Sequence, residues 1–213
     1  MTRTIVCYGD SNTHGADPAS ESRFPPEVRW PGVMRKGLGA GYAVIEEALG
    51  GRTTVWDSPL APGRNGRDYL LPCLWSHAPL DLVIIMLGTN DLKTVHGVSA
   101  NEIASGAGVL VDLARQSLAG PDRTPPAVLL VAPMPLGPTT DRSELWGFGA
   151  AREESGRLGS LYRLVARMKG AHFLDAGEVV ETSPLDGVHL DEQAHARLGA
   201  ALADAVREAL GPG

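Results

Sequence analysis

The stretch "LDLVIIML", residues 80–87, is apolar at every position except Asp81. A strand buried on both faces has such a nearly continuous run of Val, Ile and Leu, because helices cover both sides of a parallel sheet. The stretch "AVLLVA" at 127–132 has the same character. Together the two stretches predict the centre of a parallel sheet that lies between two layers of helices.

Other apolar runs flank these two and predict further strands of the sheet, at "TIVCY" (4–8), "YAVIEE" (42–47) and "AHFLDA" (171–176). Helical patterns alternate with the strands, at 27–38, 99–119, 151–169 and 191–210, and Cys73 is expected in a further helix. The alternation predicts a three-layer α/β/α sandwich with a mostly parallel sheet of about five strands. No linker or internal repeat interrupts the pattern, so residues 1–213 are expected to form a single domain.

The charge pattern excludes several classes of partner. The formal net charge is −6, and acidic and basic residues are interspersed without a Lys/Arg run. We therefore expect no nucleic-acid partner and no binding to an anionic membrane. The first predicted strand begins too early for an apolar leader, and no apolar run is long enough to span a membrane. With two isolated cysteines, Cys7 and Cys73, these features lead us to expect a cytoplasmic protein.

Polar segments follow the predicted strands, and in a parallel sheet the carboxyl ends of the strands share the edge where ligands bind. These segments are "GDSN" (9–12), "ALGGRTT" (48–54), "GTND" (88–91), "PMPLGP" (133–138) and "DGVHLDEQAH" (186–195). They supply a serine, a glycine pair, an asparagine, and an Asp and a His three residues apart. A serine hydrolase needs this set: a nucleophile, a base with its carboxylate, and donors for an oxyanion.

The chain resembles the SGNH (GDSL-type) hydrolase family over essentially its whole length. The four signature residues of that family match Ser11, Gly51, Asn90 and His189, in the family's order. The segments "RWPGV" (29–33), "VIEEALGGRTT" (44–54) and "PLDLVIIMLGTNDLK" (79–93) further resemble its bacterial arylesterase-like branch. The resemblance implies a flavodoxin-like fold and a serine esterase that works on a small-molecule ester through an acyl-enzyme.

Two more properties follow from the resemblance. The branch includes enzymes whose acyl-enzyme passes its acyl group to alcohols or peroxide as well as to water. We expect the serine mechanism itself to need no metal or organic cofactor. Relatives often form homo-oligomers, including octamers, so an oligomer is expected here.

Each motif residue has a catalytic and a plainer interpretation. Ser11 is expected to be the nucleophile, although Ser is also a common helix N-cap. His189 is expected to be the base and Asp186 its partner, the alternative being a loop histidine beside a helix-capping acid. Asp191 and His195 are competitors, and the sequence places Asp191 at the start of the last helix and His195 on its polar face.

An oxyanion hole is expected from three donors: the N–H groups of Ser11 and Gly51 and the side-chain amide of Asn90. A turn glycine and a capping asparagine are the plainer interpretations of the last two residues. The neighbouring Asp10, Thr89 and Asp91 are expected to brace the loops by local hydrogen bonds.

Four residues are expected to contact the substrate: Asn12, His14, Trp146 and Phe148. His14 stands where close relatives often carry an aromatic residue, which predicts a more polar pocket. The loop 133–150, which carries Trp146 and Phe148, is expected either to wall the acyl and alcohol sites or to form a subunit contact or plain surface. Small, glycine-rich entry loops favour a short acyl group such as acetyl.

Two other function classes compete with the serine esterase. A metal-dependent phosphoesterase would use Asp10, Asn90, Asp91, Asp186 and His189 as ligands, but Ser11 would then have no role. A nucleotide- or flavin-binding module would need a glycine-rich phosphate loop, and the first turn lacks G-x-G-x-x-G.

Overall fold

A computed structural model describes residues 2–20 and 22–211 and contains one five-stranded sheet. Its order is β2-β1-β3-β4-β5, and every neighbouring pair is parallel. The strands are β1 (Arg3–Gly9), β2 (Tyr42–Ala48), β3 (Leu82–Met86), β4 (Ala127–Ala132) and β5 (His172–Asp175). The predicted parallel α/β fold is confirmed, and "LDLVIIML" supplies the central strand of the sheet.

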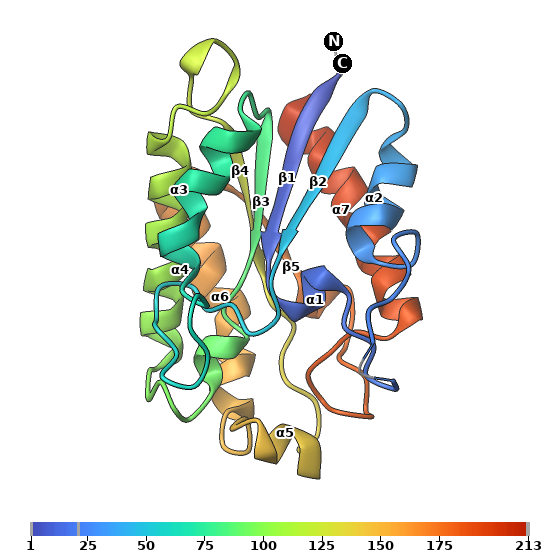
Figure 1. The fold of residues 1–213 in the computed structure, drawn as a ribbon, viewed down its shortest axis with the longest axis vertical. Helices are drawn as coiled ribbons and strands as arrows, with labels where there is room; N and C mark the ends of the chain where they lie inside the picture. The colour runs from blue at the N-terminus through green and yellow to red at the C-terminus, as the bar shows by residue number, and fades with distance from the viewer. Residues whose placement is uncertain (1, 21, 212–213) are drawn as a thin grey trace.

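Helices cover both faces of this sheet (Figure 1). One layer contains α3 (Gly66–His77), α4 (Ala100–Gln116) and α6 (Arg152–Lys169), and the other contains α2 (Trp30–Leu38) and α7 (Glu192–Leu210). Successive side chains of β3 enter opposite layers: Val83 and Ile85 join the first core, and Leu82 and Ile84 join the second. Both faces of β3 are therefore buried, which explains its uninterrupted apolar sequence.

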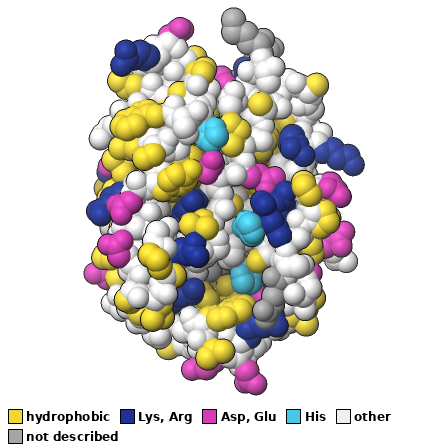
Figure 2. All heavy atoms as spheres, in the orientation of Figure 1, with side chains coloured by type: hydrophobic (Ala, Val, Ile, Leu, Met, Phe, Trp, Pro, Cys, Tyr) yellow, Lys and Arg dark blue, Asp and Glu magenta, His cyan; other side chains and the backbone are white. Residues whose placement is uncertain are grey.

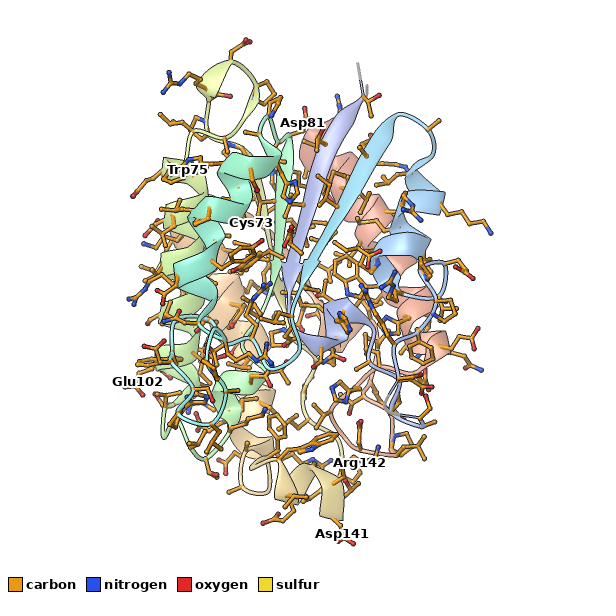
Figure 3. All side chains as sticks on the ribbon, viewed as in Figure 1. Cys73, Trp75, Asp81, Glu102, Asp141 and Arg142 are labelled. Atoms are coloured by element: carbon orange, nitrogen blue, oxygen red, sulfur yellow. The ribbon has the colours of Figure 1, made fainter. Side chains whose placement is uncertain are left out.

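The predicted helix starts have the capping groups that their sequences suggest. Ser99 and Glu102 form a reciprocal capping box at the start of α4, where Figure 3 shows Glu102. Asp191 accepts a hydrogen bond from the Ala194 N–H at 2.8 Å and caps α7. The helix predicted from residue 27 begins only at Trp30, because Pro25 and Pro26 keep the preceding segment in a turn.

Short helices follow the carboxyl ends of the strands, at the lower edge of the sheet in Figure 1. They are α1 (Ser11–His14), η1 (Asn90–Leu92), α5 (Asp141–Leu145) and η3 (Ala176–Glu178). A further turn, η2 (Pro121–Arg123), precedes β4 at the other end of the sheet. Asp81 lies at that opposite end as well, where it accepts from the Thr4 N–H at 2.7 Å (Figure 3).

In the part of the chain that the structure describes, no helix has the length and apolar character needed to cross a membrane.

Candidate active site

A tight turn between β1 and α1 presents Ser11 at the carboxyl edge of the sheet. Asp10 is the N-cap of α1, and its carboxylate accepts from the Asn12 N–H at 2.9 Å. Gly9 must be glycine because a Cβ there would lie 2.0 Å from the Thr13 hydroxyl. Ser11 is thus the first residue of α1, with its side chain on the rim of the turn.

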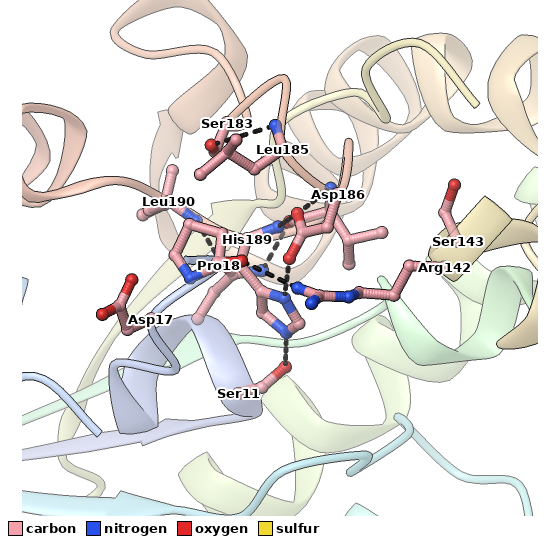
Figure 4. Close-up of polar contacts among 12 residues, drawn as sticks. Ser11, Asp17, Pro18, Arg142, Ser143, Ser183, Leu185, Asp186, His189 and Leu190 are labelled. Carbon is pink, nitrogen blue, oxygen red and sulfur yellow. Dashed lines mark hydrogen bonds and ion pairs between the residues drawn. The ribbon is translucent and has the colours of Figure 1, made fainter. Parts of the chain in front are cut away.

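Ser11, His189 and Asp186 are joined by a continuous line of hydrogen bonds, drawn in Figure 4. The Ser11 Oγ lies 3.0 Å from His189 Nε2, and His189 Nδ1 lies 2.7 Å from Asp186 Oδ2. The other oxygen of Asp186 accepts from the N–H groups of Val188 and His189, both at 2.9 Å. The structure therefore brings together the three residues that the sequence singled out as nucleophile, base and carboxylate.

The environment of Asp186 keeps it ionised. Its burial raises the pKa, but hydrogen bonds from the His189 ring and from the His189 and Val188 amides outweigh burial and leave the pKa lowered. A carboxylate held in this way fixes the ring so that Nδ1 carries the proton and Nε2 accepts from Ser11.

The turn at Gly50 and Gly51 lies beside Ser11. A Cβ placed on Gly50 would come within 3.9 Å of the Ser11 Cβ, and Gly51 has a φ of 79°, which favours glycine. Within residues 2–20 and 22–211, neither the Ser11 N–H nor the Gly51 N–H has a protein acceptor. Both groups are free to donate to a substrate oxygen beside the Ser11 hydroxyl.

Asn90 is closely tied to the protein. Its amide nitrogen donates to the Arg52 carbonyl at 3.1 Å and, less closely, to Asp10 at 3.4 Å. The side chain thereby connects the segments that follow β1, β2 and β3. To serve as an oxyanion donor, Asn90 has to turn the hydrogen that faces Asp10 toward the substrate.

Two fully buried carboxyl groups, Asp10 and Asp91, brace this edge of the sheet as the sequence predicts. Asp91 accepts from the Thr54 N–H at 3.0 and 3.1 Å and from the Thr54 hydroxyl. Burial raises the pKa of Asp10 to about 6 and that of Asp91 to about 7. Their role is to hold the turns that present Ser11 and Asn90.

Asn12 was expected to contact the substrate, and the structure places it elsewhere. Its side chain is 1% exposed, donates to the Val188 carbonyl at 3.2 Å and accepts from the Leu190 N–H at 3.1 Å. The amide thus bonds the main chain on both sides of His189, which fits positioning of the base and leaves no surface for a ligand.

Trp146 lies beside His189, and its expected contact with the substrate stays a prediction. Its ring packs edge-on against His189, with the ring centroids 5.5 Å apart. Arg142 supports it: its guanidinium lies 5.8 Å from the Trp146 ring and donates to the Pro18 carbonyl at 2.7 Å (Figure 4). A cavity of about 380 Å³ runs beside these residues and is lined by both Gly51 and Trp146.

The other two expected substrate contacts differ from each other. Phe148 is only 4% exposed and belongs to the core, with the Lys93 ammonium 5.3 Å from its ring. Its burial leaves almost none of the ring accessible to a ligand. His14 is half-buried at the end of α1, and burial, with Arg23 and Arg29, lowers its pKa. Its ring interacts with the Ala48 backbone at the end of β2, and its expected contact with the substrate stays a prediction.

Arg52 is a site residue that sequence reasoning missed. It is 4% exposed, and its guanidinium donates to the Gly9 carbonyl at 3.0 Å and the Glu47 carbonyl at 2.6 Å. It also lies 4.3 Å from the Tyr8 ring. Arg52 therefore joins the ends of β1 and β2, a role that no local sequence pattern indicates.

His195 is a correction to the sequence analysis, which placed it on the polar face of its helix. The residue is fully buried, and its Nδ1 accepts from the Trp30 N–H at 3.2 Å. The reason is the close packing of α7 on α2: at Gly199, one turn later, a Cβ would lie 2.6 Å from Val33. A histidine on this face must therefore lie in the interior.

The residues of the metal-dependent alternative do not form one cluster. Among described residues, the Cys, His and acidic groups close enough to share an ion are Glu47, Cys73 and His77. Glu47 belongs to β2, and Cys73 and His77 belong to α3, so none of the expected metal ligands is among them. The carboxyl groups of Asp10 and Asp91 instead accept hydrogen bonds from backbone N–H groups of the protein.

Comparison with known proteins identifies the family of the chain. Residues 7–197 match the GDSL-like lipase/acylhydrolase family. No curated protein sequence matches the chain. Among solved structures, the M. smegmatis aryl esterase is 42% identical, with a TM-score of 0.93 over 98% of this chain and 100% of that chain. Est24, a carbohydrate acetylesterase from Sinorhizobium meliloti, is 43% identical, with a TM-score of 0.92 over 97% and 99% of the two chains.

The motif order, the fold and the family match point to the same conclusion. Each of the four signature residues lies in a segment that follows a strand of the sheet. The match to the family extends from β1 into α7. The chain belongs to the GDSL-like lipase/acylhydrolase family, as its motifs predicted.

Proposed function

We propose that the protein is a serine esterase that hydrolyses short-chain carboxylic esters through an acyl-enzyme on Ser11. One observation carries the proposal: the line of hydrogen bonds from Ser11 through His189 to Asp186 lies beside two unpaired N–H groups, those of Ser11 and Gly51. The family of the chain makes ester hydrolysis the expected reaction class.

In the first step, the Ser11 oxygen attacks the ester carbonyl while His189 Nε2 takes the hydroxyl proton. Asp186 stabilises the imidazolium that forms. The carbonyl oxygen gains negative charge and accepts hydrogen bonds from the Ser11 and Gly51 N–H groups, joined by Asn90 once its amide turns from Asp10. His189 then returns the proton to the leaving alcohol, which leaves the acyl group on Ser11.

In the second step, His189 Nε2 takes a proton from a water molecule that attacks the acyl-enzyme. The tetrahedral intermediate uses the same donors, and its collapse returns the proton to Ser11. An alcohol or peroxide in place of this water gives a new ester or a peracid. We include such acyl transfer in the proposal on the strength of the resemblance to the arylesterase-like branch.

The names of related proteins support a small acyl group. The solved relatives described above are an aryl esterase and a carbohydrate acetylesterase. Acetyl esters of aryl or sugar alcohols are therefore the first substrates to test. Assembly into a homo-oligomer and a cytoplasmic location belong to the same proposal and rest on the resemblance and on the sequence.

The test is hydrolysis of p-nitrophenyl acetate by Ser11→Ala. We expect turnover to fall by at least about a thousandfold, since the nucleophile is lost. Ser160→Ala, at an exposed serine of α6, is the matched control and should keep full activity. Near-wild-type hydrolysis by Ser11→Ala would reject the proposal. A panel of acetyl, butyryl and octanoyl esters then measures the acyl limit, and faster turnover of octanoate would reject the small acyl site.

A further inference from the structure

The cavity beside the Ser11 site is lined by cations in an otherwise acidic protein. Arg64 and Lys93 line it, together with His96, and no Asp or Glu is among its lining residues. The whole chain has a formal net charge of −6, so the positive charge of this cavity is opposite in sign to the net charge of the protein. Figure 2 shows Lys and Arg side chains, with some His and acidic ones, in the middle of the face of the molecule seen in Figure 1.

The part of the chain that the structure describes gives the side chains of Arg64 and Lys93 no ion pair with a carboxylate. Among the described residues, neither side chain forms an ion pair or donates a hydrogen bond, and both are half-buried. The Lys93 ammonium lies 5.3 Å from the centroid of the Phe148 ring. Burial lowers the pKa of Lys93; the Asp10 carboxyl opposes that shift, and Arg64 adds to it. An anion in the cavity would attract both cations.

The two cations lie close to the reacting atoms. Arg64 packs against the turn that carries a proposed oxyanion donor: a Cβ on Gly51 would be 3.6 Å from Arg64 Nε. Lys93 follows η1, which begins at Asn90, and it is close enough to Asp10 to affect the pKa of that group. A ligand held by Arg64 and Lys93 would therefore lie within one substrate length of Ser11.

We assign the cavity to the leaving alcohol of the substrate, because it borders groups on both sides of the proposed reaction centre. It extends from Gly51, beside the expected carbonyl oxygen, to Trp146, whose ring packs against His189. His189 is the group that returns the proton to the leaving oxygen in the proposed reaction. This assignment has the alcohol part of an ester enter the cavity between Gly51 and Trp146.

We propose that Arg64 and Lys93 bind a carboxylate on the alcohol part of the substrate, so that the preferred esters are short acyl esters of hydroxy acids. This inference rests on the proposed esterase function and specifies its substrate class. Guanidinium and ammonium groups in a half-buried cavity bind a carboxylate by charge-assisted hydrogen bonds.

The test compares two esters of similar shape: meta-acetoxybenzoate, which carries a carboxylate, and meta-acetoxybenzamide, which carries a neutral carboxamide in its place. Each kcat/KM is divided by the rate of hydroxide-driven hydrolysis of the same ester, which removes the difference in leaving-group reactivity. We expect a preference of at least about tenfold for the carboxylate, the scale of one charge-assisted hydrogen bond. About 0.5 M NaCl should reduce this preference, because salt screens charges that are partly exposed.

Variants assign the preference to the cavity. Arg64→Gln and Lys93→Met should each lower the ratio of the two kcat/KM values several-fold, and the double variant should bring it near one. Lys93→Arg keeps a cation and should keep a preference. Arg67→Gln is the matched control, because Arg67 is exposed on α3 and does not line the cavity; it should leave the ratio unchanged.

Three results would overturn the inference. The first is a ratio near one in the unmodified enzyme, and the second is a ratio that the double variant does not change. If Arg64 only stabilised the oxyanion, for example, both esters would slow equally and the ratio would stay constant. The third is a preference for an anionic acyl group instead, measured with the ethyl half-ester of succinate against its terminal amide.

Failure of the inference and failure of the proposed function give different results. If the charge preference is absent but the neutral ester is still hydrolysed through Ser11, only the inferred carboxylate site is rejected. Hydrolysis of the neutral ester by Ser11→Ala removes the esterase proposal itself.

Discussion

Asn12 holds the main chain on both sides of His189. Its amide donates to the Val188 carbonyl at 3.2 Å and accepts from the Leu190 N–H at 3.1 Å. Because Asn12 directly follows Ser11, one residue ties the helix of the nucleophile to the loop of the base. The 3.0 Å contact between Ser11 and His189 depends on this connection between segments far apart in the sequence.

The first prediction follows from this connection. Asn12→Ala removes two buried hydrogen bonds and should lower kcat at least about tenfold, because the base loses its alignment. KM should change little, since Asn12 has no surface for a substrate. The free energy of unfolding should drop by about 1–3 kcal/mol. A rise in KM with unchanged kcat would instead indicate the substrate contact that the sequence suggested.

The second prediction concerns Asp186. Asp186→Asn keeps the shape of the side chain but loses the charge that stabilises the imidazolium. We expect kcat to fall by about 10²–10⁴ with the fold intact, measured by ester hydrolysis and circular dichroism. Asp191→Asn is the control, because the Asp191 side chain caps α7, whereas the His189 ring is hydrogen-bonded to Asp186. An equal loss of kcat in both variants would contradict the assigned role of Asp186.

The third prediction separates the oxyanion donor from backbone strain. Gly51→Ala should lower kcat by about 10²–10³, because the strained turn displaces the N–H that faces the oxyanion. Gly39→Ala is the control: Gly39 has a similar φ of 84° with open space around it, at the end of α2. Both variants should lose stability, and only Gly51→Ala should lose turnover. Equal activity in the two would remove Gly51 from the mechanism.

The fourth prediction is a pH dependence of stability at His195. Burial lowers the pKa of this residue from 6.5 to about 4, with Asp191 opposing the shift and Arg29 and His189 adding to it. Because the folded state holds a neutral ring, only the unfolded state gains a proton as the pH falls from about 6.5 to about 4. The group therefore costs stability over that range, by about 3 kcal/mol in total.

Urea unfolding at several pH values tests this sign. The free energy of unfolding of His195→Gln minus that of the unmodified chain should increase toward low pH, because only the unmodified chain loses stability there. A difference between the two proteins that stays constant from pH about 7 to pH about 4 would contradict a depressed pKa.

Sequence reasoning reached the fold and the central residues because those depend on local signals. The continuous apolar run before Gly88 has one physical meaning, a strand buried on both faces, and the Asp186–His189 spacing brings the two side chains together within one loop. The single-domain assignment of residues 1–213 stays a prediction.

What sequence reasoning missed depends on packing between distant segments. The side chain of Arg52 reaches the ends of two strands, and that of Asn12 reaches a loop more than a hundred residues away. The burial of His195 follows from the close contact of α2 with α7, which a helical pattern in one segment does not contain. The charge of the cavity similarly comes from two loops, at Arg64 and Lys93, that only the fold brings together.

The most direct test of the account is the site of covalent labelling by a fluorophosphonate, which reports an activated serine without choosing a substrate. After reaction to completion, mass spectrometry should find one adduct per chain, on the peptide that contains Ser11. His189→Gln should label far more slowly and Ser11→Ala not at all. A stoichiometric adduct on any other residue, or full labelling of Ser11→Ala, would contradict the claim that Ser11 is the nucleophile.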